Sequence, residues 1–282
     1  MPLRVMTFNV LHSSTRNLAA PWAARRPVVM NTIRSIQPDV ACLQEVSTLQ
    51  LEDLRNDLGE YAFLEGAPSG ATTIPRWVSW STPLAKWFFG DFYDRGELCP
   101  ILLRRGRVTS TQEGAFHLHA ERSKAFLGGP RTPHVVTWAR VQDVADGSVC
   151  TVYNTHLGLV PWTARQITSD LVAKLDQAWN HEPQILTGDF NSTPTGPVVR
   201  ALLTSRNGGP PAFRDSWIEA KRRSGSGRTF HWGFDLPGPR IDYILVRPLC
   251  SVIEAGTSSF KTGSIFASDH AAFTADLDLQ AT

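Results

Sequence analysis

The sequence predicts an α/β sandwich with large mixed β-sheets and helices on the outside. Short apolar runs of strand length alternate with helix-length segments early in the chain, and strands predominate later. Neither kind of glycine-rich loop that binds nucleotide phosphates is present, which also favours the sandwich. Polar residues fall at the ends of predicted strands on a common edge, the usual place for chemistry on such scaffolds.

The composition is typical of one globular domain over residues 1–282. Of all residues 42% are apolar and 19% are charged, which is enough to bury a sizeable core. No apolar run approaches the roughly 18 residues that cross a bilayer. A strand begins almost at once, at Leu3, so we expect no signal peptide and a cytoplasmic protein.

The cysteine spacing and the net charge limit the classes of protein to which this sequence can belong. The four cysteines lie far apart without a Cys-x-x-Cys pair, so we expect buried apolar residues, not a zinc site or a disulfide framework. A net charge of +2 does not indicate nucleic acid by itself. A basic run between Arg200 and His231 would suit a phosphate-bearing substrate, and a solvated loop is the alternative.

The first predicted elements are a strand and a helix. Residues 3–10 alternate between apolar and polar side chains, and the strand has Asn9 at its end. Pro27 stands where a helix can begin, and apolar residues recur at helical spacing until Pro38 ends them.

A second strand brings the first carboxylate to the predicted edge. Residues 39–46 form an apolar run typical of a strand buried on both sides, and Glu45 lies at its end. A carboxylate there is costly unless it faces a cation, and a salt bridge to an arginine is the alternative. A helix over about 48–58 and a short strand over 61–64 follow.

A long loop over about 66–95 is unusually aromatic. Seven aromatic residues fall within the seventeen residues 77–93, far above the 10% background, and Trp80 and Trp87 are among them. Loops of this length are usually functional or disordered, and the aromatic content does not fit disorder. A cluster packed on the sheet edge, a lip that stacks on substrate and a hairpin that dips into a membrane are the three interpretations.

The central part of the chain is rich in strands. Three of them are predicted at residues 98–103, 108–118 and 134–141. Glu97 precedes the first, and a basic, glycine-rich loop over 122–131 separates the last two. The next strand, 149–157, ends in Asn154 and His156, two apart on one face. A lone histidine at such a position is more often structural than catalytic.

The remaining elements carry the other polar residues. An amphipathic helix over 162–179 precedes a buried strand, 184–191, in which Asp189 and Asn191 stand two apart on one face; an Asx turn is the alternative. A short helix after Pro197, a strand over 240–246 that includes Asp242, and a last strand over 272–279 complete the chain. Asp269 and His270 directly precede that last strand.

The strand-end residues are acids, amides and histidines without a cysteine or a serine nucleophile elbow. Oxygen ligands with few imidazoles suit Mg²⁺ or Mn²⁺ better than a closed zinc site. The full set is Asn9, Glu45, Glu97, Asn154, His156, Asp189, Asn191, Asp242, Asp269 and His270.

Six short phrases in this order resemble the endonuclease/exonuclease/phosphatase superfamily, the DNase I-like phosphoesterases. They are Thr-Phe-Asn-Val, Leu-Gln-Glu-Val, Asn-Thr-His-Leu, Gly-Asp-Phe-Asn, Arg-Ile-Asp-Tyr-Ile and Ser-Asp-His, and they span residues 7–270. The resemblance implies a four-layer α/β/β/α sandwich, two mixed sheets face to face between helices. It also implies a divalent metal in a cleft at one end.

The resemblance also implies roles for individual residues. Asn9, Glu45 and Asp269 are expected on the metal side. Asp189 and Asn191 are expected to position the attacking water and a phosphoryl oxygen. His270 would contact the scissile phosphate, oriented by Asp242, and His156 would be oriented by Glu97. Substrate contacts are assigned to Asn154, Arg131, Trp80 and Trp87.

The expected function is a Mg²⁺- or Mn²⁺-dependent hydrolase of phosphoester bonds, acting on nucleic acid, a nucleotide or another small phosphoester. A phospholipid-headgroup phosphodiesterase of the sphingomyelinase type is the alternative, with the aromatic loop touching a membrane. A non-catalytic binding protein on the same fold is a third possibility, but it requires a degraded site, whereas every expected polar position is filled.

Overall fold

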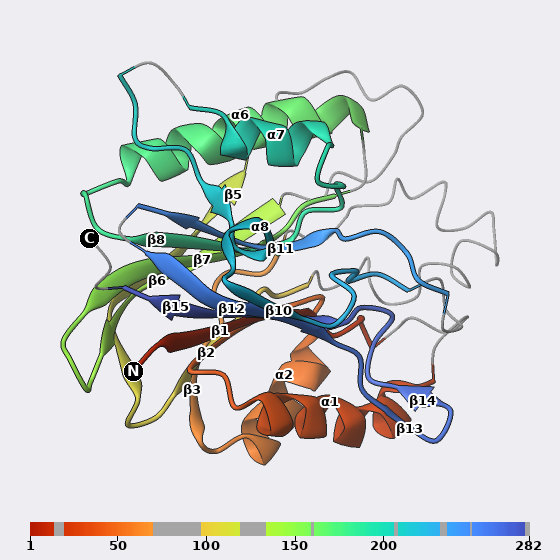
Figure 1. Ribbon diagram of the computed structural model, residues 1–282. Coiled ribbons are helices and arrows are strands. Elements are labelled where there is room, and N and C mark those ends of the chain that lie inside the picture. The colour runs from red at the N-terminus through yellow and green to blue at the C-terminus, as the bar shows by residue number, and fades with distance from the viewer. Residues whose placement is uncertain are drawn as a thin grey trace.

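The computed structural model describes residues 1–13, 20–69, 97–118, 134–158, 161–205, 208–231, 236–248 and 250–279, without the side chains of residues 161–163. These ranges form two mixed β-sheets that lie face to face, with helices on both outer faces (Figure 1). The predicted fold class, a four-layer α/β/β/α sandwich, is confirmed.

One sheet contains both ends of the described chain. In spatial order its strands are β10 (Arg222–Ser224), β12 (Ser251–Ser258), β15 (Ala272–Asp278), β1 (Leu3–Asn9), β2 (Val40–Gln44), β4 (Ile101–Arg104) and β3 (Tyr61–Leu64). Helices α1 (Trp22–Ile36) and α2 (Thr48–Asp57) cover its outer face (Figure 1). A small hairpin, β13 (Lys261–Thr262) with β14 (Ile265–Phe266), lies beside α1.

The other sheet is built from the middle of the chain. In spatial order its strands are β5 (Val108–Leu118), β6 (His134–Asp143), β7 (Val149–His156), β8 (Gln184–Asp189), β11 (Asp242–Arg247) and β9 (Arg214–Asp215). Helices α6 (Pro161–Gln177) and α7 (Pro197–Leu203) cover its outer face, and the short α8 (Ser216–Glu219) lies near its edge (Figure 1). None of the described helices has the length and apolar character needed to cross a membrane.

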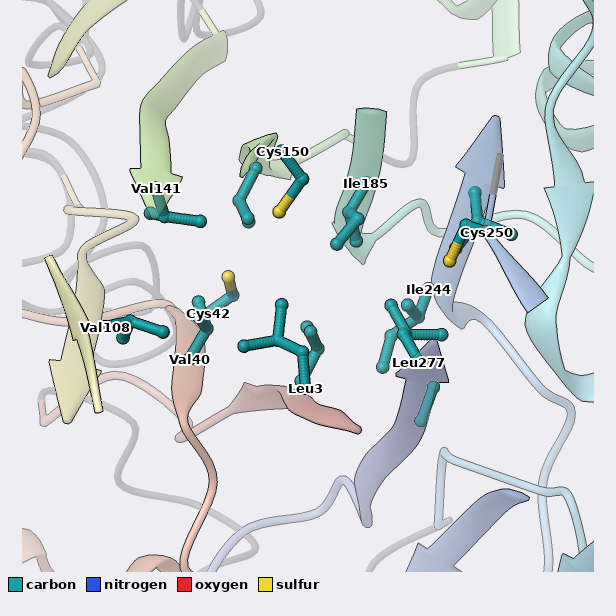
Figure 2. Packing of buried hydrophobic residues seen from close by; sticks show 14 of the residues in the cluster. Leu3, Val40, Cys42, Val108, Val141, Cys150, Ile185, Ile244, Cys250 and Leu277 are labelled. Atoms are coloured by element: carbon teal, nitrogen blue, oxygen red, sulfur yellow. The ribbon is translucent and has the colours of Figure 1, made fainter. Parts of the chain in front are cut away.

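The core between the sheets is apolar and fully buried. Figure 2 shows side chains from the two sheets pointing toward one another, among them Cys42 of β2, Cys150 of β7 and Ile185 of β8. All four cysteines are buried and unpaired, as predicted. Burial raises the pKa of the Cys42 thiol to about 12, so this thiol behaves as an apolar side chain.

The strand directions bring the predicted site residues to one edge. β1 and β2 run parallel, as do β7 and β8, so their carboxyl ends emerge together in each sheet. β15 and β11 run antiparallel to their neighbours β1 and β8, so they start where those strands end. β1 also contacts β8 and β11 across the sandwich. Strand ends from both sheets therefore meet at one place.

Helix α1 begins earlier than predicted. It starts at Trp22, and Pro27 lies inside it, although such a proline lacks the N–H that would bond to the carbonyl four residues back. Tertiary contacts hold this first turn: Trp22 Nε1 donates to Asp53 Oδ2 at 2.7 Å, and Arg25 binds four backbone carbonyls. Because these partners are distant in sequence, the sequence does not reveal the turn before Pro27. The proline alone therefore placed the predicted start of the helix too late.

Two other differences concern strands. The strand predicted at 98–103 is regular only from Ile101, because Pro100 has no N–H to pair, and Leu98 forms an isolated bridge with Val46. β12 was not predicted at all. A register shift between Val252 and Glu254 breaks the alternation that would have revealed it.

Gly188 permits the close approach of β7 and β8, and its replacement tests how strongly the site depends on that approach. Its φ is +144°, and a Cβ at this position would lie 1.9 Å from the Thr155 carbonyl oxygen. We expect Gly188→Ala to destabilise the fold by about 2 kcal/mol or more and to lower activity, because the strands carrying His156 and Asp189 must separate.

Gly106→Ala is the matched control for Gly188→Ala. Its φ is +75° and nothing would lie within 4 Å of a methyl group added at that position, so only the backbone conformation is disfavoured, by about 1–2 kcal/mol. Thermal unfolding measures both variants. Equal losses of stability together with unchanged turnover in Gly188→Ala would show that the site tolerates strand separation.

Candidate active site

Asn9 joins two carboxylates that come from different sheets. Its Nδ2 donates to Glu45 Oε1 at 2.9 Å and to Asp189 Oδ2 at 3.1 Å, and its Oδ1 accepts the Leu11 N–H at 3.0 Å. The other Glu45 oxygen accepts the His12 N–H at 3.0 Å. Leu11 and Glu45 have φ values of +57° and +58°, a region that residues other than glycine seldom occupy outside functional sites.

Asp189 is the centre of the site. Its Oδ2 lies 3.6 Å from His156 Nε2 and 3.6 Å from His270 Nε2, and its Oδ1 accepts the Asn191 N–H at 2.8 Å. The side chain is buried, and burial with the nearby Asp242 charge raises the pKa of Asp189 to about 6. Two imidazoles thus face one carboxylate that accepts a proton more readily than an exposed aspartate does.

His270 is held by Asp242. Its Nδ1 lies 2.9 Å from Asp242 Oδ2, and Thr229 Oγ1 fixes the start of β11 by accepting the Asp242 N–H at 3.0 Å. Burial disfavours the charged ring, but Asp242 and Asp189 outweigh it and raise the pKa of His270 to about 10. The ring of Phe230 packs edge-on against the imidazole with centroids 5.2 Å apart.

His156 is held by Glu97 on one side and by Asn191 on the other. Nδ1 lies 2.8 Å from Glu97 Oε1, and Nε2 lies 3.0 Å from Asn191 Nδ2. The same Nδ2 donates to the Leu157 carbonyl at 2.8 Å, which fixes the orientation of the amide. Asn191 follows β8 with a φ of +47°, so it is not in the extended segment that the sequence predicted.

Two indications of the charge on His156 disagree. Burial disfavours the charged ring, yet Glu97, Asp189 and Glu45 hold its pKa well above the usual value. The Asn191 N–H instead requires Nε2 to accept a hydrogen bond, which only the neutral ring with its proton on Nδ1 can do. A bound cation would weaken the effect of these carboxylates on the ring but not the hydrogen bond from Asn191, so the bond favours a neutral His156.

Asp269 follows the loop that leads into β15. Its Oδ1 accepts the Ser268 hydroxyl at 3.2 Å, and its carbonyl accepts the His231 N–H at 2.8 Å. Burial raises the pKa of Asp269, and the negative charge of Glu45 adds to this effect. Asp269 and Glu45 therefore lie near enough to repel one another.

Asn154 does not face the open site, which corrects its assignment to substrate binding. It is fully buried, and its Nδ2 donates to the carbonyls of Leu43 at 2.8 Å and Pro100 at 3.0 Å. Its Oδ1 accepts Gln44 Nε2 at 2.7 Å. With both N–H groups used, Asn154 joins β7 to the opposite sheet and has no donor left for a substrate.

The other three substrate contacts assigned from the sequence cannot be placed. Trp80, Trp87 and Arg131 lie outside the described residues, as does most of the aromatic loop. Sequence reasoning missed four residues that contact the site in the structure: Arg25, His134, Thr229 and Phe230. His134 Nδ1 lies 3.1 Å from the His156 carbonyl oxygen, and only its position at a strand start could have indicated this.

The donors at this edge fit a hard divalent cation. Asp189, Asp242 and His270 offer ligand atoms within 4.8 Å of one another and could hold a metal ion. This group differs from the expected set of Asn9, Glu45 and Asp269, which remains a prediction. Burial raises the pKa of Asp189 and of Asp269, and the charges of Asp242 and Glu45 respectively raise them further, so a bound cation would offset the cost of ionising both groups. Asp242 Oδ1 is also buried without a hydrogen-bond partner among the described residues.

The fold and the site combine oxygen donors that could hold a metal with two histidines, each held by a carboxylate. The chain belongs to the Endonuclease/Exonuclease/phosphatase family, whose sequence profile matches residues 6–270. The resemblance seen in the sequence is thereby confirmed. Members of this family are metal-dependent hydrolases of phosphoester bonds.

Solved structures with the same fold span almost the whole chain. An endonuclease/exonuclease/phosphatase from Bacteroides vulgatus is 24% identical with a TM-score of 0.78, and the match covers 99% of each chain. A mannosyl-6-phosphatase from Bacteroides thetaiotaomicron is 20% identical, with a TM-score of 0.73 and coverage of 98% and 99%. TDP2 from D. rerio, complexed with single strand DNA product, is 18% identical, with a TM-score of 0.68 and coverage of 98% of each chain. A search of curated proteins found no match.

Proposed function

We propose that this protein hydrolyses phosphoester bonds with the help of Mg²⁺ or Mn²⁺, by direct attack of water and without a covalent intermediate. The observation that carries the proposal is the convergence of two imidazoles on Asp189, each ring held by its own carboxylate. The buried Cys42 and Cys99 both have raised pKa values, so neither supplies a thiolate nucleophile.

The residues divide the proton transfers between them. Asp189 accepts a proton from the attacking water as its oxygen bonds to phosphorus. His270, charged at neutral pH, donates from Nε2 to the departing oxygen as the phosphorus–oxygen bond breaks. Proton transfer from Asp189 to His270, 3.6 Å away, then restores both groups.

The other polar residues orient these groups and bind charge. When substrate binds, one N–H of the Asn191 amide would turn from His156 Nε2 to a phosphoryl oxygen, where negative charge grows in the transition state, and Glu97 would keep the His156 ring in place. Glu45 and Asp269 would hold a divalent cation, with Asn9 linking Glu45 to Asp189. A bound cation would act as a Lewis acid on the phosphoryl group.

The substrate class is a nucleic acid, a nucleotide or another small phosphoester. The structural relatives do not choose among these, since one is a mannosyl-6-phosphatase and another holds a single-stranded DNA product. Both relatives suggest compounds to include in a substrate screen.

A hydrolysis screen in isotopically labelled water tests the proposal. Protein stripped with EDTA is supplied with Mg²⁺ or Mn²⁺ and offered plasmid DNA, single-stranded DNA, RNA, sugar phosphates and lysophospholipid. We expect turnover only after metal is restored, with one oxygen of the phosphate product derived from water. Turnover in EDTA, or none with any substrate in either metal, would contradict the proposal.

The expected pH dependence of kcat/KM follows from the raised pKa values of Asp189 and His270. Because Asp189 must be charged to accept a proton, kcat/KM should fall as pH decreases through about 6, where Asp189 becomes protonated. Because His270 must be charged to donate, kcat/KM should fall again as pH rises toward about 10. A pH profile of kcat/KM measures both limbs.

Asp242→Asn provides the internal check on the alkaline limb. Asp242 is the largest of the charges that raise the pKa of His270, so its neutralisation should move that limb to lower pH. Because the Asp242 charge also raises the pKa of Asp189, the acidic limb should move to lower pH as well. An alkaline limb that does not move would assign it to a group other than His270.

A further inference from the structure

Arg25 is buried beside the site without an ion pair among the described residues. It lies in the first turn of α1 and is 1% exposed. Its guanidinium donates to four backbone carbonyls: Nε to Ala20 at 2.9 Å, Nη1 to Val10 at 2.7 Å and Ala267 at 2.9 Å, and Nη2 to Leu11 at 2.8 Å. A buried charge satisfied only by carbonyl groups is unusual and calls for a purpose.

Three of these carbonyls belong to the segments that carry the acidic end of the site. Val10 and Leu11 directly follow Asn9, and Leu11 and the next residue donate their N–H groups to Asn9 and Glu45. Ala267 lies two residues before Asp269. One guanidinium therefore ties the segment leaving β1 to the segment entering β15.

Only arginine can make this connection. Its planar fork directs several N–H groups along fixed, separate directions, whereas the single nitrogen of lysine cannot span carbonyls on different segments. Burial lowers the pKa of Arg25 to about 10, while Asp269 and Glu45 favour the charged form, so the group is cationic at neutral pH. The Arg25 guanidinium also adds a positive charge near the carboxylates of Asp269 and Glu45.

We propose that Arg25 is a positioning residue that fixes Asp269 relative to Glu45 and thereby sets the affinity of the site for a divalent cation. This inference rests on the proposed function, because it requires that these carboxylates hold a cation. It also gives a reason for the early start of α1, because the turn before Pro27 delivers Arg25.

The test compares two buried arginines. Arg247 is also fully buried, and it donates to Gln184 Oε1 at 2.9 and 3.0 Å, to Asp176 Oδ1 at 2.7 Å and to the Leu175 carbonyl at 3.0 Å. It ends β11, whereas the site residue Asp242 begins that strand. Arg247→Lys thus imitates the structural damage of Arg25→Lys away from the site, and both variants keep their charge.

The measured quantity is the dissociation constant of Mn²⁺, from titration followed by electron paramagnetic resonance. We expect Arg25→Lys to weaken Mn²⁺ binding by about tenfold or more, as is typical when a residue that orients metal ligands is lost. Arg247→Lys should bind Mn²⁺ like the wild type, although both variants lose thermal stability. Equal Mn²⁺ affinity in Arg25→Lys and wild type would overturn the inference.

Two further measurements distinguish a failure of the proposed cation site from a failure of the inference about Arg25. If wild type binds Mn²⁺ no better than Glu45→Gln, the proposed cation site itself is wrong. If Arg25→Lys does not fold, hydrogen exchange of the wild type replaces it: Mn²⁺ should slow exchange in residues 22–26 as well as in residues 10–13 and 267–270. Protection of the last two segments without residues 22–26 would show that Arg25 does not couple the helix to the site.

Discussion

Asp189→Asn is expected to lose hydrolysis almost completely while the metal-free protein becomes more stable. Turnover should fall by about 10³-fold or more, because the group that accepts the proton from water is removed and the two imidazoles lose their common partner. Stability should rise because the folded state holds this buried carboxylate at a pKa of about 6, above its unfolded value, so its ionisation disfavours folding.

The gain in stability has a defined pH dependence. The penalty from Asp189 is absent below about pH 4, where the group is protonated in both states, and it grows to about 3 kcal/mol as pH rises past 6. Thermal unfolding of metal-free Asp189→Asn and wild type should therefore coincide near pH 4 and differ by several degrees at pH 8.

Asp143→Asn is the control for a buried aspartate without a catalytic role. Asp143 is 3% exposed at the end of β6 and is paired with Arg107, so its neutralisation should destabilise the protein and leave turnover unchanged. If Asp189→Asn were also destabilising at pH 8 and kept its turnover, Asp189 would be an ordinary structural acid.

Glu45→Gln is expected to remove the response to metal together with the activity. Burial raises the pKa of Glu45, but the N–H groups of Asn9 and His12 and the charge of His270 lower it, so Glu45 is charged at neutral pH. Glutamine keeps the shape but not the charge, and its amide nitrogen must face one of those N–H donors. Turnover should fall by about 10³-fold, with only a modest loss of stability in the absence of metal.

Thermal unfolding with and without Mg²⁺ or Mn²⁺ measures the response directly. A ligand that binds only the folded state raises the melting temperature, and the shift grows with the ratio of its concentration to its dissociation constant, so wild type should shift and Glu45→Gln should not. Glu182→Gln, which removes a carboxylate paired with Arg140 away from the site, should shift like wild type. A full metal shift in Glu45→Gln would remove Glu45 from the cation site.

Much of the fold could be predicted because local pattern and tertiary environment agree. β3 and β5 have the predicted bounds, and for β3 the short apolar run lies between Gly59 and Gly66. The family resemblance also implied which histidine meets which acid, and the structure places Glu97 beside His156 and Asp242 beside His270. Their catalytic roles stay predictions.

The parts that could not be predicted depend on partners distant in sequence. Asn154 resembles a strand-end site residue, but its amide is used by carbonyl groups of the opposite sheet. Arg25 gives no local signal, because its partners are backbone atoms as far away as Ala267. Thr229 and Phe230 act through β11 and His270, which they meet only after the chain has folded.

Because Asn9 bonds to carboxylates of both sheets, the geometry of the proposed active site depends on the distance between the two sheets. Glu45 follows a strand of one sheet and Asp189 ends a strand of the other, and a single carboxamide spans them with bonds of 2.9 and 3.1 Å. Figure 2 shows side chains of the two sheets packed against one another in the core between them, and in such close packing a change of one methylene group affects the neighbouring side chains. A substitution that alters the distance between the sheets would therefore also alter the distance between Glu45 and Asp189.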